Sequence, residues 1–282
     1  MDMPLLAYGT WVESKDTASL ITDRVRTAIQ MGYTHIDTAQ NYGTEWYAIQ
    51  GIQQSGISRS QIFFTSKLTE LMDPKQLSLR LGPLQYYDLL LLHFPPMNAR
   101  SREEFKKKLL PIWIGMNTYL NFGIAKAIGV SNFYQNHLDI LLNICNDTGL
   151  TPPLVNQIEI HIGNLELTYV PYMQSKGIIP FAHTPLGGLG SHYLLQNEIL
   201  LSISQRLSAS PAQVILAYLL QRGIGVVTTS SNPTHIKDIL SAPELIPNFS
   251  IQDMQAIDST ESNLGPIVDG SIAAFEHNIF LY

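Results

Sequence analysis

Short apolar runs alternate with amphipathic segments along most of the chain. Eight of these runs have the length and composition of buried strands, and they cover residues 5–9, 34–38, 62–67, 87–93, 125–130, 154–160, 178–183 and 225–230. Between them, apolar positions recur at helical spacing and predict helices at residues 18–31, 45–54, 102–121, 134–148, 165–176 and 210–223. Strands that alternate with helices predict a parallel sheet, and near-continuous apolar strands predict that both of its faces are buried.

An open doubly wound sheet and a closed barrel both agree with this order of elements. The residues after the first apolar run read "GTWVES", which is not the G-x-G-x-x-G motif of a dinucleotide-binding sheet. The count of eight strand-like runs also favours closure. We therefore expect an α/β protein, a (β/α)8 TIM barrel in which residues 1–282 form a single domain.

Charge and cysteine content exclude several classes of function. The formal net charge of -6 gives no support for a nucleic-acid or anionic-membrane partner. Cys145 is the only cysteine, so neither an internal disulfide nor a thiolate zinc cluster can form. The opening "MDMPLLAYGTW" has no basic region and no long apolar region of a secretory signal. We expect a cytoplasmic monomer or weak homo-oligomer that binds no metal, nucleic acid or membrane.

Polar residues interrupt the apolar pattern where three successive strand-like runs end. Asp37 ends the second run, Lys67 the third and His93 the fourth, while Tyr42 lies in the loop after Asp37. Each has an ordinary explanation, as a turn residue, a surface lysine or a hydrogen-bonded core histidine. In barrels of this type, however, the active site lies at the C-terminal ends of the strands. The occurrence of Asp37, Lys67 and His93 at consecutive strand ends therefore predicts that they share one site.

The chemistry that suits these four groups is proton transfer by a tyrosine. A free phenol has a pKa of about 10, and a nearby ammonium lowers it by stabilising the phenolate. Lys67 can supply the ammonium, Asp37 can hold Lys67 charged, and His93 can orient a substrate carbonyl. Because no side chain donates hydride, reduction of that carbonyl implies a nicotinamide cofactor.

Seven segments together resemble the aldo-keto reductase family over almost the whole chain. They are "GYTHIDTAQNYGTE", "FFTSKL", "YYDLLLLHFP", "AIGVSNF", "VNQIEIH", "PLG" and "SPAQVILAYLLQRG", and they follow the family's order. The resemblance implies a (β/α)8 barrel and NADPH-dependent carbonyl reduction. It also implies a catalytic tetrad of Asp37, Tyr42, Lys67 and His93, the same four residues that the strand ends indicate.

The resemblance further implies which residues hold the cofactor. Ser131, Asn132 and Gln157 match the groups that bind the nicotinamide carboxamide, and His183 takes the place of the family's stacking tyrosine. The remaining implied cofactor contacts are Gly9, Thr10, Trp11, Asp37, Thr184, Pro185, Leu186, Gly187, Thr229, Ser230, Ser231, Asn232 and His235.

The segment "TTSSNPTHI" after the eighth run departs from the family pattern. Thr229 and His235 stand where basic residues usually grip the 2′-phosphate of NADPH. Charge-assisted hydrogen bonds are about twice as strong as neutral ones, so their loss weakens selection for that phosphate. We expect NADP(H) as the cofactor, with NAD(H) as the alternative and a small preference between them.

Aromatic residues after strand ends indicate the substrate class. Trp11 and Phe94 are expected to contact the substrate together with Tyr42 and His93, while Trp113 is expected in the core. An aromatic wall suits a small apolar or aromatic carbonyl compound. Two other functions stay open, namely a non-catalytic nicotinamide-sensing subunit and non-redox carbonyl chemistry such as isomerisation or cyclisation. The tail at residues 263–282 follows a predicted helix at residues 251–260. The resemblance implies that substrate specificity resides in this tail, but the tail carries no recognisable signature.

Overall fold

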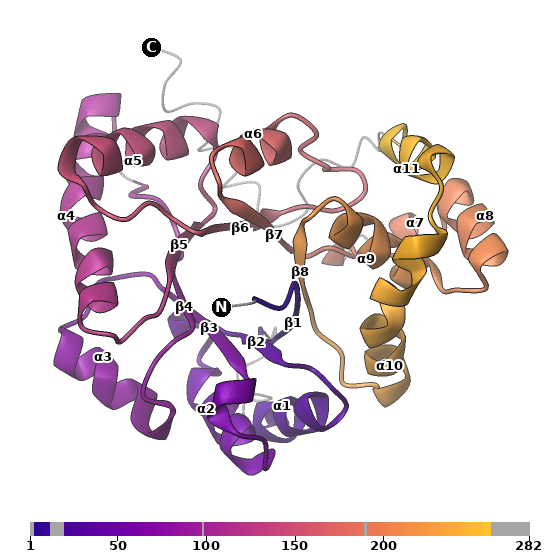
Figure 1. Ribbon diagram of the computed structural model, residues 1–282, viewed down its shortest axis with the longest axis horizontal. Coiled ribbons are helices and arrows are strands. Elements are labelled where there is room, and N and C mark those ends of the chain that lie inside the picture. Colours follow the sequence, from indigo (N-terminus) through magenta and orange to yellow (C-terminus); the bar gives the residue numbers. More distant parts are fainter. Residues whose placement is uncertain (1–2, 12–19, 98, 189–190, 261–282) are drawn as a thin grey trace.

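The structure is a closed barrel of parallel strands surrounded by helices (Figure 1). This computed structural model describes residues 3–11, 20–97, 99–188 and 191–260. The strands follow one another around the barrel in sequence order, and β1 closes the ring by pairing with β8. The prediction of a (β/α)8 barrel is therefore confirmed.

The described strands are short and lie where the apolar runs predict them. They are β1 (Leu6–Gly9), β2 (His35–Asp37), β3 (Phe63–Leu68), β4 (Leu89–Leu92), β5 (Ile128–Ser131), β6 (Val155–Glu159), β7 (Ile179–His183) and β8 (Gly225–Thr228). The eighth run was predicted to reach residue 230, but β8 ends at Thr228. Thr229 and Ser230 therefore belong to the loop that follows the strand.

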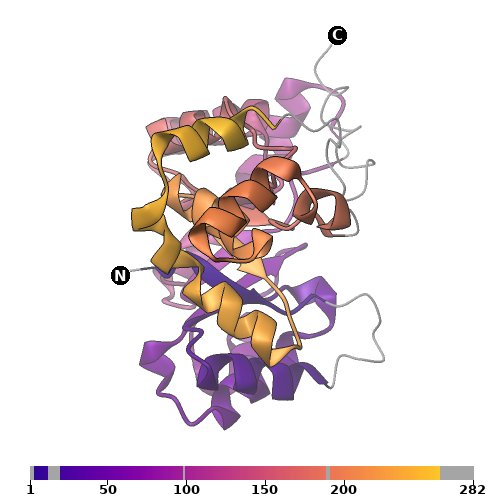
Figure 2. The same ribbon diagram turned by 90° about the vertical axis from the view of Figure 1, so that its right-hand side faces the viewer.

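The helices pack around this barrel, as the side view also shows (Figure 2). They are α1 (Leu20–Gln30), α2 (Glu45–Gln54), α3 (Pro74–Leu81), α4 (Arg102–Asn121), α5 (Gln135–Thr148), α6 (Tyr169–Ser175), α7 (Ser191–Leu195), α8 (Glu198–Leu207), α9 (Pro211–Gln221), α10 (Pro233–Ser241) and α11 (Ile251–Asp258). The sequence pattern predicted α11, as a helix at residues 251–260, but it did not predict α3, α7, α8 or α10. Two of the unpredicted helices, α3 and α7, have eight residues or fewer, so they show few turns of periodicity.

Local chemistry explains the start of α9, which carries the strongest apolar run. Ser210 Oγ accepts a hydrogen bond from the Gln213 amide, and Gln213 Oε1 accepts one from the Ser210 amide. This reciprocal capping satisfies two backbone donors at the helix start, and Pro211 at the first helical position needs no donor partner. Helix α4 buries Trp113 completely, which confirms its expected place in the core.

Alternation along the strands places the polar residues inside the barrel mouth. Successive strand side chains point to opposite faces, so every second residue faces the interior. The interior apolar cluster contains Phe63, Val155 and Phe181, among others. Lys67 lies four residues after Phe63, and His183 lies two after Phe181, so both share the inward direction.

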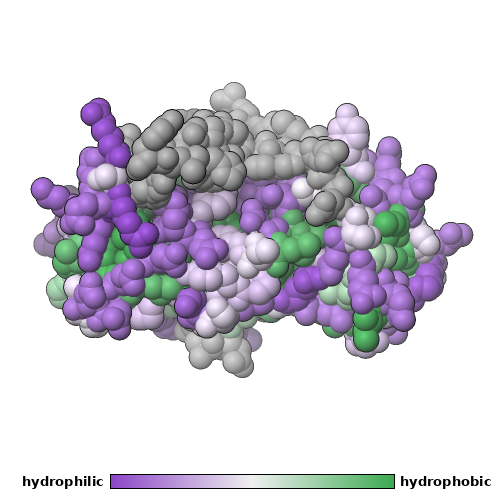
Figure 3. Space-filling model, turned by 90° about the horizontal axis from the view of Figure 1, so that it is seen from above, coloured by the Kyte–Doolittle hydropathy of each residue, from purple (hydrophilic) through white to green (hydrophobic). Residues whose placement is uncertain are grey.

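Outside the barrel, a larger apolar cluster fills the space between strands and helices. On the side drawn in Figure 3, hydrophilic residues cover most of the described surface and hydrophobic residues form small groups. No helix within the described ranges is both long enough and apolar enough to span a membrane.

Candidate active site

A cavity of about 490 Å³ lies at the C-terminal ends of the strands. The structure brings many of the residues predicted for the site to its wall. These are Gly9, Thr10, Trp11, Asp37, Tyr42, His93, Phe94, Ser131, Asn132, Gln157, His183, Thr184, Pro185, Leu186 and Thr229. Residues from every strand end except that of β3 therefore meet in one concave space.

Lys67, from β3, lies beneath this wall and is completely buried. Its ammonium nitrogen is 2.5 Å from Asp37 Oδ1, 3.0 Å from the Thr38 carbonyl oxygen and 3.3 Å from the Tyr42 hydroxyl. The hydroxyls of Thr10 and Thr38 are hydrogen-bonded to each other at 2.8 Å, which holds the Thr38 backbone in place. The order Asp37, Lys67, Tyr42 that the sequence indicated is thus a chain of direct contacts.

The protonation of this group differs in one respect from the sequence-based expectation. Burial raises the pKa of Tyr42 above its usual range, and this effect outweighs the opposing influence of Lys67. The expected lowering of the Tyr42 pKa is therefore wrong for this arrangement. For Lys67, burial acts to lower the pKa, but Asp37 and Tyr42 outweigh it and the net shift is upward. The site therefore holds a protonated phenol beside a charged ammonium.

The rings of His93 and Tyr42 lie next to each other in the cavity wall, in an edge-to-face arrangement. The two ring centroids are 5.6 Å apart, and the His93 ring stacks on Phe94 at 4.3 Å. Burial, with the nearby Lys67 charge, lowers the pKa of His93 to about 2. Among the described residues, His93 Nδ1 has no hydrogen-bond partner. His93 is therefore a neutral group at working pH, able to offer a hydrogen bond but not a positive charge.

Three polar residues from β5 and β6 form the next part of the wall. Gln157 Nε2 donates to Asp37 Oδ2 at 2.9 Å, so both carboxylate oxygens of Asp37 are occupied. Ser131 Oγ donates to the Gln157 carbonyl oxygen at 2.8 Å, and Asn132 Nδ2 donates to the His93 carbonyl oxygen at 3.0 Å. The bond between Gln157 and Asp37 links this wall to the lysine, a connection that the sequence did not indicate.

His183 joins the same network from β7. Its Nε2 lies 3.3 Å from Asn132 Oδ1, and its Nδ1 lies 3.1 Å from Thr184 Oγ1. Because the Asn132 amide nitrogen already donates elsewhere, Asn132 Oδ1 must accept, which assigns the proton to His183 Nε2. Burial lowers the pKa of His183 to about 4. His183 is thus a neutral ring fixed by two hydrogen bonds.

Both residues that bond to the His183 ring have left-handed backbone conformations. The φ angles are +60° at Asn132 and +56° at Thr184. The second value is unusual for a β-branched residue, and such conformations persist only where the surrounding structure imposes them. Their position beside His183 supports a functional constraint on this part of the wall.

The predicted adenosine end of the site is less enclosed. Thr229 Oγ1 donates to the Gly9 carbonyl oxygen at 2.8 Å, and Asn232 caps α10 through the Thr234 amide. Five residues predicted for the cofactor do not line the cavity, namely Gly187, Ser230, Ser231, Asn232 and His235. The sequence gives the order of these residues along the chain, but the backbone conformation of their loops decides whether each side chain reaches the cavity. No lysine or arginine is among the described residues that line the cavity.

Sequence reasoning missed four lining residues, namely Asn41, Gly188, Val227 and Thr228. Asn41 directly precedes Tyr42 in the sequence, and this position could have indicated that Asn41 lines the cavity. Trp46, an aromatic residue four positions after Tyr42, is exposed on α2 and does not line the cavity. The C-terminal tail considered for substrate specificity lies outside the described residues.

A buried carboxylate beside the site was also missed. Glu45 opens α2 and accepts hydrogen bonds from Ser66, Arg80 and Tyr87. Ser66 precedes Lys67 in β3, so this cluster ties the first turn of α2 to the strand that carries the lysine. The segment "GYTHIDTAQNYGTE" ends at Glu45, but it indicated no role for this residue, because the partners of Glu45 come from three separate segments.

Known proteins resemble this chain in sequence and in structure. A family model described as "Aldo/keto reductase family" matches residues 5–262. "Aldo-keto reductase family 1 member C4" of Macaca fascicularis is 31% identical over 94% of this chain and 90% of its own length. "9,11-endoperoxide prostaglandin H2 reductase" of Trypanosoma cruzi (strain CL Brener) is 32% identical over 90% of this chain and 83% of its own length.

A solved structure shows the same likeness. The crystal structure of MGS-M4, an aldo-keto reductase enzyme from a Medee basin deep-sea metagenome library, is 30% identical in sequence. The match has a TM-score of 0.80 and covers 95% of this chain and 96% of that chain.

Proposed function

The chain belongs to the aldo/keto reductase family, and on that premise we propose that it reduces an aldehyde or ketone to an alcohol by hydride transfer from NADPH or NADH. The observation that carries this proposal is the contact chain from Asp37 through Lys67 to the Tyr42 hydroxyl, which opens on the cavity. It provides a positioned proton donor where a carbonyl oxygen can bind.

Tyr42 is the proposed general acid. As a carbonyl carbon is reduced, its oxygen gains negative charge and needs a proton. The raised pKa of Tyr42 keeps the hydroxyl protonated at neutral pH, so the donor is present before reaction. The Lys67 ammonium, 3.3 Å from that oxygen, then stabilises the phenolate left behind.

Asp37 and His93 are proposed to support this transfer. Asp37 holds Lys67 charged and in place through its 2.5 Å contact. His93, held neutral by its lowered pKa, can donate a hydrogen bond to the substrate carbonyl without competing as a charged acid. The stacking of His93 on Phe94 fixes the plane of the ring. The carbonyl would thus be oriented between His93 and Tyr42.

The residues of the wall fit a nicotinamide cofactor. Ser131, Asn132 and Gln157 present one hydroxyl and two amides on one side of the cavity, a set that matches the donors and acceptors of a carboxamide. The neutral His183 ring lies beside them and can pack against a flat heterocycle. Thr184, Pro185 and Leu186 continue the wall toward the proposed diphosphate position. These residues would hold the cofactor.

We propose that the enzyme uses both NADPH and NADH with a small preference. The lining has no lysine or arginine among the described residues, and the exposed His235 stands outside the cavity. A 2′-phosphate would therefore meet hydroxyl and amide groups more than cations. Thr229 is itself engaged with the Gly9 carbonyl, which limits its use as a phosphate ligand.

The proposed substrate is a small apolar or aromatic carbonyl compound. Trp11 and Phe94 line the cavity close to Tyr42 and His93, and apolar side chains of β8 and its neighbours complete it. Such a wall favours neutral rings and alkyl groups over charged substrates.

The test is a reductase assay with NADPH or NADH and a panel of aromatic aldehydes and ketones. The Tyr42→Phe variant should lose at least about a hundredfold in kcat, the usual contribution of a positioned acid, and should still bind cofactor. Tyr193→Phe is the matched control, because Tyr193 is exposed on α7 and lies outside the cavity. Full activity of Tyr42→Phe would show that the assigned acid is wrong. Cofactor binding without turnover of any carbonyl would favour a sensing subunit instead.

A further inference from the structure

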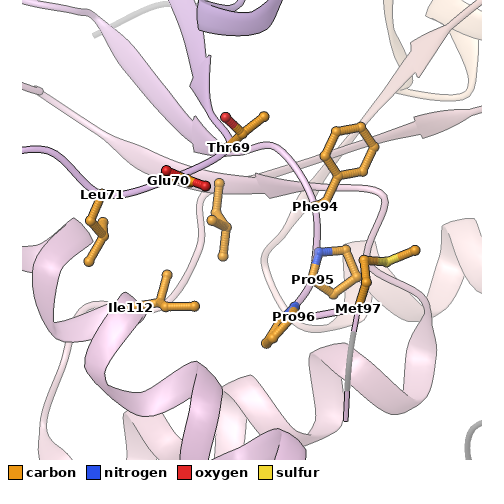
Figure 4. Close-up of a pocket in the computed structure, with 9 residues that line it drawn as sticks. Thr69, Glu70, Leu71, Phe94, Pro95, Pro96, Met97 and Ile112 are labelled. Atoms are coloured by element: carbon orange, nitrogen blue, oxygen red, sulfur yellow. The ribbon is translucent and has the colours of Figure 1, made fainter.

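A second cavity of about 450 Å³ lies beside the candidate active site, on the outer side of the barrel (Figure 4). It is formed by the segments after β3 and β4 together with helix α4. The described lining residues are Thr69, Glu70, Leu71, Leu92, Phe94, Pro95, Pro96, Met97 and Ile112. We call this space the α4 groove. Apart from Thr69 and Glu70, its lining side chains are apolar.

One wall of the α4 groove is fastened to the helix. The Met72 amide donates to the Tyr119 hydroxyl at 2.8 Å, and that hydroxyl donates to the Met72 carbonyl oxygen at 2.6 Å. A side chain on Gly115 would come within 2.4 Å of Leu71, so the absence of one lets Leu71 lie directly on α4. This wall is therefore anchored by α4 at two points.

The opposite wall is stiff for a different reason. Pro95 and Pro96 follow Phe94 directly, and each proline ring restricts its backbone to a narrow range of φ. Leu92 is a buried lining residue, and Ile112 lies on the side of the groove formed by helix α4. Because both walls are constrained, the α4 groove is preformed and does not require a ligand to open it.

The α4 groove and the candidate active site share one lining residue. Phe94 lines both cavities, and its ring stacks on His93 at 4.3 Å. Figure 4 shows Phe94 at one end of the space, with Leu71 and Ile112 at the end away from it. Phe94 therefore lies between the two cavities, and a group attached to a carbonyl bound at His93 would reach the α4 groove by passing the Phe94 ring.

We propose that the α4 groove is a second substrate subsite, which takes an extended apolar group of the carbonyl compound. This inference rests on the proposed carbonyl reduction and adds the substrate class. The preferred substrate has a neutral alkyl chain or aryl extension on the far side of its carbonyl. Glu70 is the only ionisable side chain among the described lining residues, and no cation accompanies it. A carboxylate at the end of that chain would therefore be disfavoured.

Filling the α4 groove tests the proposal. The readout is the ratio of kcat/KM for para-hexylbenzaldehyde to kcat/KM for benzaldehyde. Ile112→Trp should lower this ratio roughly tenfold, because the hexyl chain loses burial of several methylene groups. Leu71→Trp fills the same space from the rim and keeps the test available if the first variant does not fold. Ile114→Trp is the control, since Ile114 lies on the same helix but is exposed and outside the groove.

The charge at the rim supplies an independent arm. Replacing the hexyl chain by a carboxypentyl chain should lower kcat/KM in the wild-type protein. For this carboxylate substrate, Glu70→Gln should raise kcat/KM roughly threefold or more above the wild-type value. Unchanged ratios in Ile112→Trp and Leu71→Trp, with benzaldehyde still reduced, would overturn the subsite while leaving the reductase proposal standing.

A binding measurement separates the two proposals. Calorimetry with para-hexylbenzyl alcohol needs no turnover, and the alcohol should bind wild-type protein more tightly than Ile112→Trp by roughly tenfold. Failure to reduce benzaldehyde would count against the reductase, whereas equal binding of this alcohol to both proteins would count against the subsite.

Discussion

The ammonium nitrogen of Lys67 lies 2.5 Å from Oδ1 of Asp37, and both side chains are almost completely excluded from solvent. The other oxygen of Asp37 accepts from Gln157 at 2.9 Å. A buried charge is costly unless it is paired, so each member of this pair depends on the other. The balance of charge inside the barrel mouth therefore rests on two residues from neighbouring strands.

Removing the carboxylate should destabilise the fold as well as the site. In Asp37→Asn, Lys67 loses its paired negative charge and keeps only neutral acceptors, including the Thr38 carbonyl and the Tyr42 hydroxyl. We expect the free energy of unfolding to fall by roughly 3 kcal/mol. Urea denaturation measures the change. Asp147→Asn breaks the exposed pair with Lys106 and should cost less than about 1 kcal/mol. Equal, small losses in both variants would show that the buried pair is not held as described.

The pH dependence of reduction follows from two opposite shifts. The pKa of Tyr42 is raised, so its hydroxyl keeps the proton as pH rises past neutrality. The pKa of His93 is lowered to about 2, so its ring stays neutral as pH falls. We expect kcat/KM for reduction to change less than threefold between about pH 6 and 9. Oxidation of the alcohol needs unprotonated Tyr42 and should rise with pH across the same range. A reductive decline centred near neutrality would indicate a different titrating acid.

The hydrogen bond between His183 and Asn132 should appear as a coupling in cofactor binding. Their 3.3 Å contact lets the His183 ring orient the Asn132 amide. Dissociation constants for NADPH in His183→Phe, Asn132→Ala and the double variant should give a coupling of about 1 kcal/mol, the usual net value of one hydrogen bond. Fluorescence titration measures these constants without turnover. Strictly additive effects would mean that the two residues act independently.

Cofactor preference should respond to one added charge on α10. The wild-type dissociation constants for NADPH and NADH should differ by less than roughly a hundredfold, or about 2.7 kcal/mol. His235→Arg should tighten the binding of NADPH relative to NADH by roughly three- to tenfold, because the guanidinium adds a charged donor for the 2′-phosphate. Gln205→Arg on α8 adds the same charge at an exposed position outside the cavity and is the control. An equal tightening of NADPH relative to NADH in Gln205→Arg would mean that the effect comes from the net charge of the protein and not from a contact with the 2′-phosphate.

Local patterns in the sequence determined much of the architecture. Apolar runs and their spacing predicted the strands and the barrel, because a buried parallel strand must be apolar on both faces. Strand ends also marked Asp37, Lys67 and His93, since parallel strands bring their C-terminal ends to one rim. The four short or weakly patterned helices α3, α7, α8 and α10 escaped prediction, because their burial depends on neighbours that sequence spacing does not reveal.

Tertiary structure decided what these residues do to one another. The sequence by itself placed Tyr42, Lys67 and His183 at one end of the barrel, but not the bond from Gln157 to Asp37 or from His183 to Asn132. It also suggested a lowered Tyr42 pKa, whereas burial raises it. The α4 groove likewise depends on Tyr119 and Met72 meeting across 47 positions of sequence. Periodicity reports the direction of a side chain, while desolvation and long-range contacts depend on which segments pack against it.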